Sequence, residues 1–225
     1  RVWSSPPGSA AHERWNLCFG DIDGDGAEDI IVAGHGGVMA YDPLDGALKC
    51  EHRYGHRSRG FIGVADIDGD GAVEFLNIGL FQIAVEVCDY RDGALTLLWG
   101  DRIELDIFAH PRMVHTPFDA LCDIDGDGRH EVIYNMFNDH GDEQWHLVIR
   151  DALTGEVRWD IPQVFLNDSL DLDGDGIREL VGIETEGRFC QGFAPAFIAH
   201  LGVDGLDAIR AHLPRGVRDG GPGAR

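Results

Sequence analysis

The sequence predicts an all-β chain, a β-propeller built from four-stranded blades. Three observations support this prediction: one acidic loop pattern occurs four times, the copies recur at about the spacing of propeller blades, and the segments between them read as short strands. We expect about four blades in these 225 residues, forming part of a ring that belongs to a longer protein.

The repeated loop has the pattern D-x-D-G-D-G-x-x-[DE] and runs directly into apolar residues. The copies DIDGDGAED, DIDGDGAVE, DIDGDGRHE and DLDGDGIRE begin at Asp21, Asp66, Asp123 and Asp171. Their starts are 45, 57 and 48 residues apart, close to the roughly 40–50 residues of a propeller blade. The longest interval indicates an insertion around residues 103–118.

Two further elements accompany each loop. The runs IIVAG, FLNIG, VIYN and LVGI follow the loops, and such short apolar runs without alternation predict strands that are covered on both faces. Further along lie LDGALKCEH, RDGALTLLW, LTGEVRWDI and VDGLDAI, in which a Gly turn between apolar runs predicts a hairpin. Each unit therefore reads as strand, acidic loop, strand, strand, turn, strand.

The two ends of the chain differ from the repeats. The segment RVWSSP resembles VRWDIP at residues 157–162, so residues 1–5 are expected to be the last strand of a preceding blade. The C-terminal RGVRDGGPGAR has no apolar periodicity and predicts a disordered end. We therefore divide the chain into residues 1–14 (end of a preceding blade and linker), 15–208 (propeller repeats) and 209–225 (tail).

Composition excludes some partners. The formal charge of −22 argues against a nucleic acid, because like charges repel, and the lack of an apolar run of 18 residues predicts no membrane insertion in this segment. Lys49 is the only lysine beside 17 arginines. This bias indicates either guanidinium recognition of carboxylate or phosphate groups or a GC-rich genome. The five cysteines have no metal-site spacing and read as small buried hydrophobes.

The loops predict divalent cation sites. Two unit charges ~4 Å apart cost about 4 kcal/mol at an effective dielectric constant near 20, and a hard cation removes that repulsion. Oxygen-only ligands favour Ca²⁺ or Mg²⁺ over zinc or copper, and flexible geometry favours Ca²⁺. The predicted ligands are the acids at loop positions 1, 3, 5 and 9 and the carbonyl at position 7: Asp21, Asp23, Asp25, Asp29 and Ala27; Asp66, Asp68, Asp70, Glu74 and Ala72; Asp123, Asp125, Asp127, Glu131 and Arg129; Asp171, Asp173, Asp175, Glu179 and Ile177.

Two alternatives for these loops carry less weight. An EF-hand requires a glutamate at position 12 and flanking helices. Position 12 here is Val32, Asn77, Tyr134 or Gly182, and strands are predicted to follow, so the EF-hand is excluded. A metal-free acidic turn is the other alternative, and fourfold repetition with the same acids argues against it.

The repeated pattern, followed by a short apolar strand, resembles FG-GAP (VCBS-type) repeats, and related calcium loops occur in integrin α propellers. The resemblance covers residues 15–204, although its Phe-Gly and Gly-Ala-Pro signatures are only partly matched, at Phe19-Gly20 and in GFAP at 192–195. It implies up to four Ca²⁺ ions and an extracellular or secreted setting, the periplasm and cell surface included. It also implies a role in adhesion or in binding a polysaccharide or an extracellular protein.

The sequence contains no nucleophile elbow, Walker loop, zincin or dinucleotide-binding motif, which favours a protein that is not an enzyme. A basic island and the insertion hold candidate ligand-binding residues, suited to uronate carboxylates of an acidic polysaccharide. These are His52, Arg53, Tyr54, His56, Arg57, Arg59, His110, Arg112 and His115. The alternative is that both segments are solvated connections between blades.

A weaker resemblance leads to a second function. The segments LLWG, HTPF and DIDGDGRHE are similar to blade junctions of family 11 rhamnogalacturonan lyases, which are propellers with comparable calcium loops. This resemblance implies a fragment of a secreted, calcium-dependent polysaccharide lyase. No residue of the sequence can be assigned as the base that a lyase requires, so the lyase remains an alternative.

Overall fold

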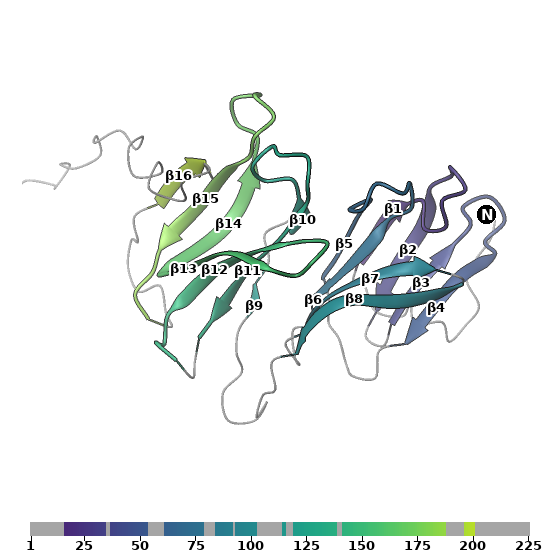
Figure 1. The fold of residues 1–225 in the computed structure, drawn as a ribbon, viewed down its shortest axis with the longest axis horizontal. Coiled ribbons are helices and arrows are strands. Elements are labelled where there is room, and N and C mark those ends of the chain that lie inside the picture. Colours follow the sequence, from purple (N-terminus) through teal and green to yellow (C-terminus); the bar gives the residue numbers. More distant parts are fainter. Residues whose placement is uncertain are drawn as a thin grey trace, which may run out of the picture.

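The computed structural model describes residues 16–34, 37–53, 61–78, 84–91, 93–102, 114–115, 119–138, 141–187 and 196–200. The secondary-structure elements of these residues are all β-strands, and they form four antiparallel sheets (Figure 1). None of the described residues belongs to a helix with the length and apolarity needed to cross a bilayer.

The four sheets follow one another along the chain. Sheet 1 consists of β1 (Asn16–Gly20), β2 (Asp29–Gly34), β3 (Gly37–Tyr41) and β4 (Leu48–Arg53). Sheet 2 consists of β5 (Phe61–Ala65), β6 (Glu74–Ile78), β7 (Ala84–Arg91) and β8 (Ala94–Arg102). Sheet 3 consists of β9 (Val114–His115), β10 (Leu121–Cys122), β11 (Glu131–Phe137), β12 (Trp145–Asp151) and β13 (Val157–Pro162). Sheet 4 consists of β14 (Val164–Leu170), β15 (Glu179–Glu184) and β16 (Ala196–His200).

Within each sheet, strands that are consecutive in sequence are neighbours, with one exception. In sheet 3, β9 and β10 both pair with β11, so two short strands take the place of the first strand of this blade. The predicted β-propeller of four-stranded blades is thereby confirmed. The sheets form an open row rather than a closed ring over the residues that the structure describes (Figure 1).

Three apolar cores hold the row together, one between each pair of successive sheets. Ile31 and Ala40 of sheet 1 pack with Phe75 of sheet 2. The next two cores join sheet 2 to sheet 3, through Leu76 and Val132 among others, and sheet 3 to sheet 4. Because successive side chains of a strand point to opposite faces, a single central strand such as β11 contributes to two cores.

The expectation that the strand after each loop is covered on both faces holds only in the middle of the row. Every residue of β6 is buried, and β11 is buried except for the half-buried Met136. In contrast, β2 mixes buried and half-buried residues, and β15 mixes buried, half-buried and exposed ones. The physical reason is position, because sheets 1 and 4 each pack against one other sheet within the described part of the chain.

Buried polar groups also connect the sheets. The amide of Asn135 on β11 donates to the carbonyl of Leu166 at 2.8 Å, and its oxygen accepts the Leu166 N–H at 2.7 Å. Asn135 and Leu166 are both fully buried. The indole of Trp99 in sheet 2 donates to the carbonyl of Ala152 in sheet 3 at 2.7 Å. These bonds satisfy groups whose burial would otherwise be costly.

The predicted Gly-turn hairpins are present in sheets 1, 2 and 3, and each is followed by a bulge. Gly46 and Gly155 have φ near +77° and +75°, the left-handed conformation that glycine adopts without strain. The register shifts next to Ala40/Tyr41 in sheet 1, Val87/Cys88 in sheet 2 and Ile149/Arg150 in sheet 3. The bulge therefore recurs at the same place in three blades.

Several predictions fall on other parts of the chain. Residues 1–14, the 209–225 tail and the VDGLDAI hairpin lie outside the described residues, so the proposed division of the chain stays a prediction. The cysteines agree with the prediction as far as they are described: Cys50, Cys88 and Cys122 are buried free thiols, and Cys18 is half-buried. Burial raises the pKa of all four.

His146 on β12 connects the β11–β12 hairpin to β13. Its Nδ1 lies 2.5 Å from Asp160, and its Nε2 lies 3.0 Å from Asp142. Burial by itself lowers the pKa of this histidine, but hydrogen bonds to the two carboxylates outweigh that effect and raise the pKa above its ordinary value. The imidazolium form is therefore favoured by folding.

We predict that Asn135→Ala lowers the free energy of unfolding by at least about 2 kcal/mol, because two buried backbone groups of Leu166 lose their partners. Urea denaturation followed by tryptophan fluorescence measures the effect. The control is Asn167→Ala, a substitution at an exposed position, which we expect to change stability by less than about 0.5 kcal/mol. Equal effects of the two substitutions would contradict this assignment.

We also predict that His146 makes the free energy of unfolding depend on pH. The folded pKa is raised, so the stabilisation is complete below the unfolded pKa of about 6.5 and is lost as pH rises through the folded pKa. Urea denaturation at about pH 6 and about pH 8.5 should show a loss of stability in the parent that His146→Gln reduces. If the free energy of unfolding changes equally with pH in the parent and in His146→Gln, the ion pairs of His146 with Asp142 and Asp160 do not stabilise the fold.

Candidate metal sites

The four acidic loops join the first two strands of each blade, at residues 21–29, 66–74, 123–131 and 171–179, and we call them loops 1 to 4. Each first aspartate organises its own loop. In loop 2, Asp66 accepts the N–H groups of Gly69 at 2.7 Å and Gly71 at 3.1 Å. Both glycines have positive φ, +79° and +96°, which lets the chain curl around the carboxylate. The same two bonds occur in the other loops.

The acid at position 9 ties the loop to the sheet. It begins the second strand of each blade, and its side chain accepts the N–H group of position 2 across the loop. The four pairs are Ile22–Asp29 at 3.4 Å, Ile67–Glu74 at 2.7 Å, Ile124–Glu131 at 3.1 Å and Leu172–Glu179 at 2.5 Å. All four acids are buried. An ionisable carboxyl group is therefore held inside the protein in every blade.

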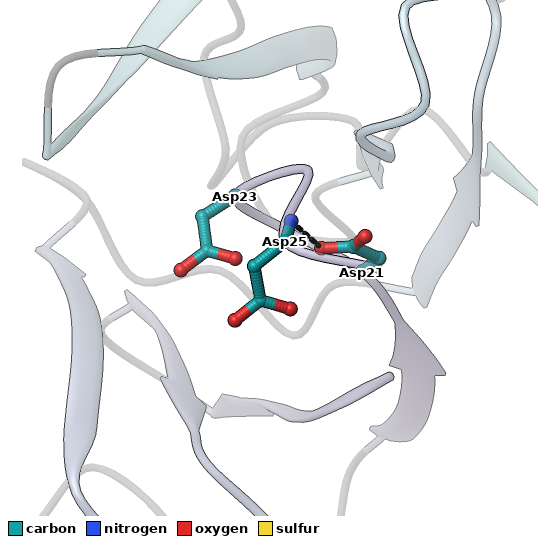
Figure 2. A group of neighbouring side chains, drawn as sticks. All are labelled: Asp21, Asp23 and Asp25. Carbon is teal, nitrogen blue, oxygen red and sulfur yellow. Dashed lines mark hydrogen bonds between the residues drawn. The ribbon is translucent and has the colours of Figure 1, made fainter. Parts of the chain in front are cut away.

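Carboxylate oxygens converge within each loop, as Figure 2 shows for Asp21, Asp23 and Asp25 of loop 1. In each loop, three of the acids have oxygen atoms within 4.8 Å of one another. The groups are Asp21, Asp23 and Asp25; Asp66, Asp68 and Asp70; Asp123, Asp125 and Asp127; and Asp171, Asp173 and Glu179. An all-oxygen donor set of this kind fits a hard divalent cation.

The remaining predicted ligands occupy other positions. The position-9 acids of loops 1 to 3, and Asp175 of loop 4, are outside these groups of three. At position 7, the N–H groups of Ala27, Ala72, Arg129 and Ile177 donate to the acid at position 5. Cation binding by the carbonyl groups of these four residues stays a prediction.

Loop 1 contains a cation from the protein itself. The ammonium group of Lys49 on β4 lies 3.1 Å from Asp23, 2.9 Å from Asp25 and 3.0 Å from Asp29. The side chain of Lys49 is 15% exposed and that of Asp29 is fully buried. Burial lowers the pKa of Lys49, but its three carboxylate partners outweigh burial and raise it. The only lysine of the chain is thus the counter-ion of an acidic loop.

Loop 3 has the same arrangement with an arginine. The guanidinium of Arg158 on β13 contacts the buried Glu131, and it lies 3.1 Å from Asp127 and 3.6 Å from Asp125. Arg129 also pairs with Asp127, at 2.7 Å. Burial raises the pKa of Glu131 to about 7, while the pKa of Asp127 is lowered, chiefly by Arg129.

Loop 2 is more acidic than the sequence pattern alone indicates. Asp89 on β7 is a fifth carboxylate, buried beside Glu74, Asp68 and Asp70, whose charges act on it. The equivalent residues in sheets 1 and 3 are Asp42 and Asp151. Their carboxylates accept backbone N–H groups of the Gly-turn hairpins. Burial raises the pKa of Glu74 to about 7 and also raises that of Asp89.

Sequence reasoning missed Lys49, Arg158 and Asp89 as neighbours of the loops. A signal for the two cations was present, because LDGALKCEH and LTGEVRWDI place a basic residue three positions after the turn glycine. Asp89 carries no such signal, since it lies 15 residues beyond Glu74 and reaches loop 2 only through strand pairing.

Neighbouring loops are also bonded to one another. The N–H group of Val73 in loop 2 donates to the carbonyl of Asp21 in loop 1 at 2.7 Å, and Val73 packs against Gly20. The N–H group of Arg178 in loop 4 lies 3.4 Å from the carbonyl of Ile124 in loop 3. Loops 3 and 4 lie side by side in the upper part of Figure 1. The conformation of one loop is therefore linked to the packing of the next blade.

The candidate ligand-binding residues lie elsewhere. His52 and Arg53 are at the end of β4 that pairs with Val38 and Gly37, which is the end of sheet 1 remote from loop 1. His115 pairs with Asn135, away from the loop end of β11. The other candidates, Tyr54, His56, Arg57, Arg59, His110 and Arg112, lie outside the described residues, as do the side chains of Arg53 and His115. The described candidates thus do not join the acidic loops.

No protein-family model and no curated protein matches this sequence. Among solved structures, the fold is similar to the C-terminal domain of Pseudomonas aeruginosa PilY1, with 18% identity and a TM-score of 0.50 over 77% of this chain and 39% of that one. It is also similar to a rhamnogalacturonan lyase, PL11, of Bacillus licheniformis, with 16% identity and a TM-score of 0.50 over 87% of this chain and 48% of that one.

This chain spans less than half the length of both structures. At this level of identity the likeness concerns the fold, and it agrees with the β-propeller architecture that the sheets define.

Proposed function

We propose that this chain is an extracellular, calcium-binding β-propeller module of the FG-GAP type, which presents a surface for a polysaccharide or protein ligand. In this proposal the acidic loops are structural sites. Bound Ca²⁺ supplies positive charge to each loop, while the loop acids hold the turn that begins the buried second strand of the blade.

One observation carries the proposal: in each loop three carboxylates have oxygen atoms within 4.8 Å of one another, and the acid at position 9, which is one of the three in loop 4, is buried. In loop 2, the Oε1 atom of the fully buried Glu74 has no hydrogen-bond partner among the described residues. A buried carboxylate oxygen without a partner is costly, and a divalent cation would remove that cost. Ligand flexibility favours Ca²⁺ over Mg²⁺.

The proposed ligand site is separate from the metal loops. The described part of the basic island lies at the opposite end of sheet 1 from loop 1, so metal binding stabilises the blades without closing that surface. The proposed setting is extracellular because extracellular calcium modules typically bind at roughly 10⁻⁴–10⁻³ M, far above cytosolic calcium levels. The polysaccharide lyase remains the alternative that the sequence resemblance raises.

We predict that about 5 mM Ca²⁺ raises the melting temperature by several degrees relative to excess chelator. The reason is that metal bound only to the folded state stabilises it by mass action, by about 2.7 kcal/mol per site at a free concentration 100 times the dissociation constant. Differential scanning calorimetry measures the shift. Mg²⁺ at the same ionic strength is the control and should produce a smaller shift.

The double variant Asp66→Asn, Asp70→Asn should lose part of this calcium effect, because it removes two acids of loop 2. An unchanged melting temperature across millimolar Ca²⁺ would rule out the metal role. The lyase alternative has a separate test on rhamnogalacturonan, in which the ultraviolet absorbance of unsaturated uronide ends reports cleavage.

A ligand role predicts binding to an acidic polysaccharide. Affinity electrophoresis in gels containing polygalacturonate should retard the parent chain, and His52→Ala, Arg53→Ala should reduce the retardation. The variant Leu153→Ala, at an exposed position, is the control and should migrate like the parent. Equal mobility of all three proteins with and without polygalacturonate would remove this ligand class.

A further inference from the structure

The bulge on the last strand of a blade places one residue beside the acidic loop. In sheet 1 the register passes from Ala40↔Cys50 to Tyr41↔Leu48, so Lys49 is the unpaired residue. In sheet 3 the unpaired residue is Arg158, between Val157 and Trp159. Both bulge residues are cations, and both reach the acids of their own loop.

Sheet 2 has the same bulge with a different residue. Its register passes from Val87↔Trp99 to Cys88↔Leu97, so the unpaired residue is Leu98. Leu98 is partly buried and packs against the core between sheets 2 and 3. An apolar side chain cannot neutralise carboxylates, so loop 2 lacks the counter-ion that the same backbone position supplies to loops 1 and 3.

Loop 2 also carries more negative charge than its neighbours. Asp89 adds a fifth carboxylate, which like Glu74 is buried, and Oε1 of Glu74 has no hydrogen-bond partner within the described ranges. Arg91 is the one cation that the described residues place on this group, through Asp89 and through Asp68 at 3.1 Å. Its side chain is 57% exposed, compared with 15% for Lys49 and 20% for Arg158. Solvent therefore screens Arg91 more strongly.

We propose that loop 2 is the tightest divalent-cation site of the first three loops, with Asp89 as an additional acidic residue, and that Lys49 and Arg158 are built-in counter-ions that a cation must displace from loops 1 and 3. This inference rests on the proposed calcium-binding function. The comparison excludes loop 4, because the segment after β16 lies outside the described residues.

The physical basis is competition for the same oxygens. A cation that enters loop 1 has to break the contacts of Lys49 with Asp23, Asp25 and Asp29, and the displaced ammonium then lies near another positive charge. In loop 2 the incoming cation meets the converging carboxylates of Asp66, Asp68 and Asp70, with the buried acids Glu74 and Asp89 beside them and only the exposed Arg91 as a competing cation. Loops 1 and 3 are thus stabilised without metal, whereas loop 2 depends on it.

Isothermal titration of the whole, calcium-depleted chain with CaCl₂ tests the assignment. Pairs of Asp→Asn substitutions at positions 1 and 5 disable one loop at a time: Asp66 and Asp70, Asp21 and Asp25, or Asp123 and Asp127. The binding step lost in the loop 2 variant should have a dissociation constant at least about tenfold below those lost in the loop 1 and loop 3 variants, about 1.4 kcal/mol.

Exchanging the bulge residues provides the reciprocal test. Lys49→Met should tighten the loop 1 step by about tenfold or more, and Leu98→Lys should weaken the loop 2 step by a similar factor. The matched control is Leu97→Lys, which adds the same charge one residue away on the opposite, more exposed face. It should change the dissociation constant of the loop 2 step by less than twofold. Asp89→Asn probes loop 2 without disturbing Leu98 in the core, and it should weaken the same step by about tenfold.

The outcomes separate the two levels of inference. Absence of calcium binding to the parent chain contradicts the proposed function as a whole. Calcium binding with equal affinity in loops 1 to 3, or tightest binding in loop 1 or loop 3, overturns the present inference and leaves the calcium-binding function standing. If Lys49→Met leaves the calcium affinity of loop 1 unchanged, Lys49 does not act as a counter-ion that calcium must displace.

Discussion

The burial of one carboxylate at the base of each acidic loop is the constraint on which the rest of the structure depends. Asp29, Glu74, Glu131 and Glu179 each begin the second strand of a blade and also accept an N–H group from across the loop. The same side chain thereby fixes the conformation of the turn and the start of the strand. A buried carboxylate is costly unless a positive partner or a proton neutralises it, so neutralisation is part of the fold and not an addition to it.

The chain supplies a counter-ion of its own in two of the blades. Lys49 and Arg158 bring positive charge from the last strand of their own blades, through a backbone bulge that frees one residue from strand pairing. In sheet 2 the same bulge holds Leu98, which contributes to a core instead. One backbone feature thus serves electrostatics in two blades and apolar packing in a third, and the identity of a single side chain decides which.

The loops and the cores form one connected system. Val73 belongs to an acidic loop, packs against Gly20 of the previous blade and donates to the carbonyl of Asp21. A change in the charge of one loop can therefore reach the interface between blades through direct contacts. The described ligand-binding candidates on β4 lie away from this row of loops, which is consistent with separate places for stability and recognition.

The sequence by itself determined the all-β architecture and the acids of the four loops, because strand length, turn glycines and repeated carboxylates are local patterns. Only the tertiary structure decided which charges face one another. Asp89 joins Glu74 through the pairing of β6 with β7, and Lys49 reaches Asp29 through a bulge two strands away. Within the described part of the chain, β2 packs against another sheet on one face only, and this depends on which sheets are neighbours, since burial is a property of the packed row and not of a strand.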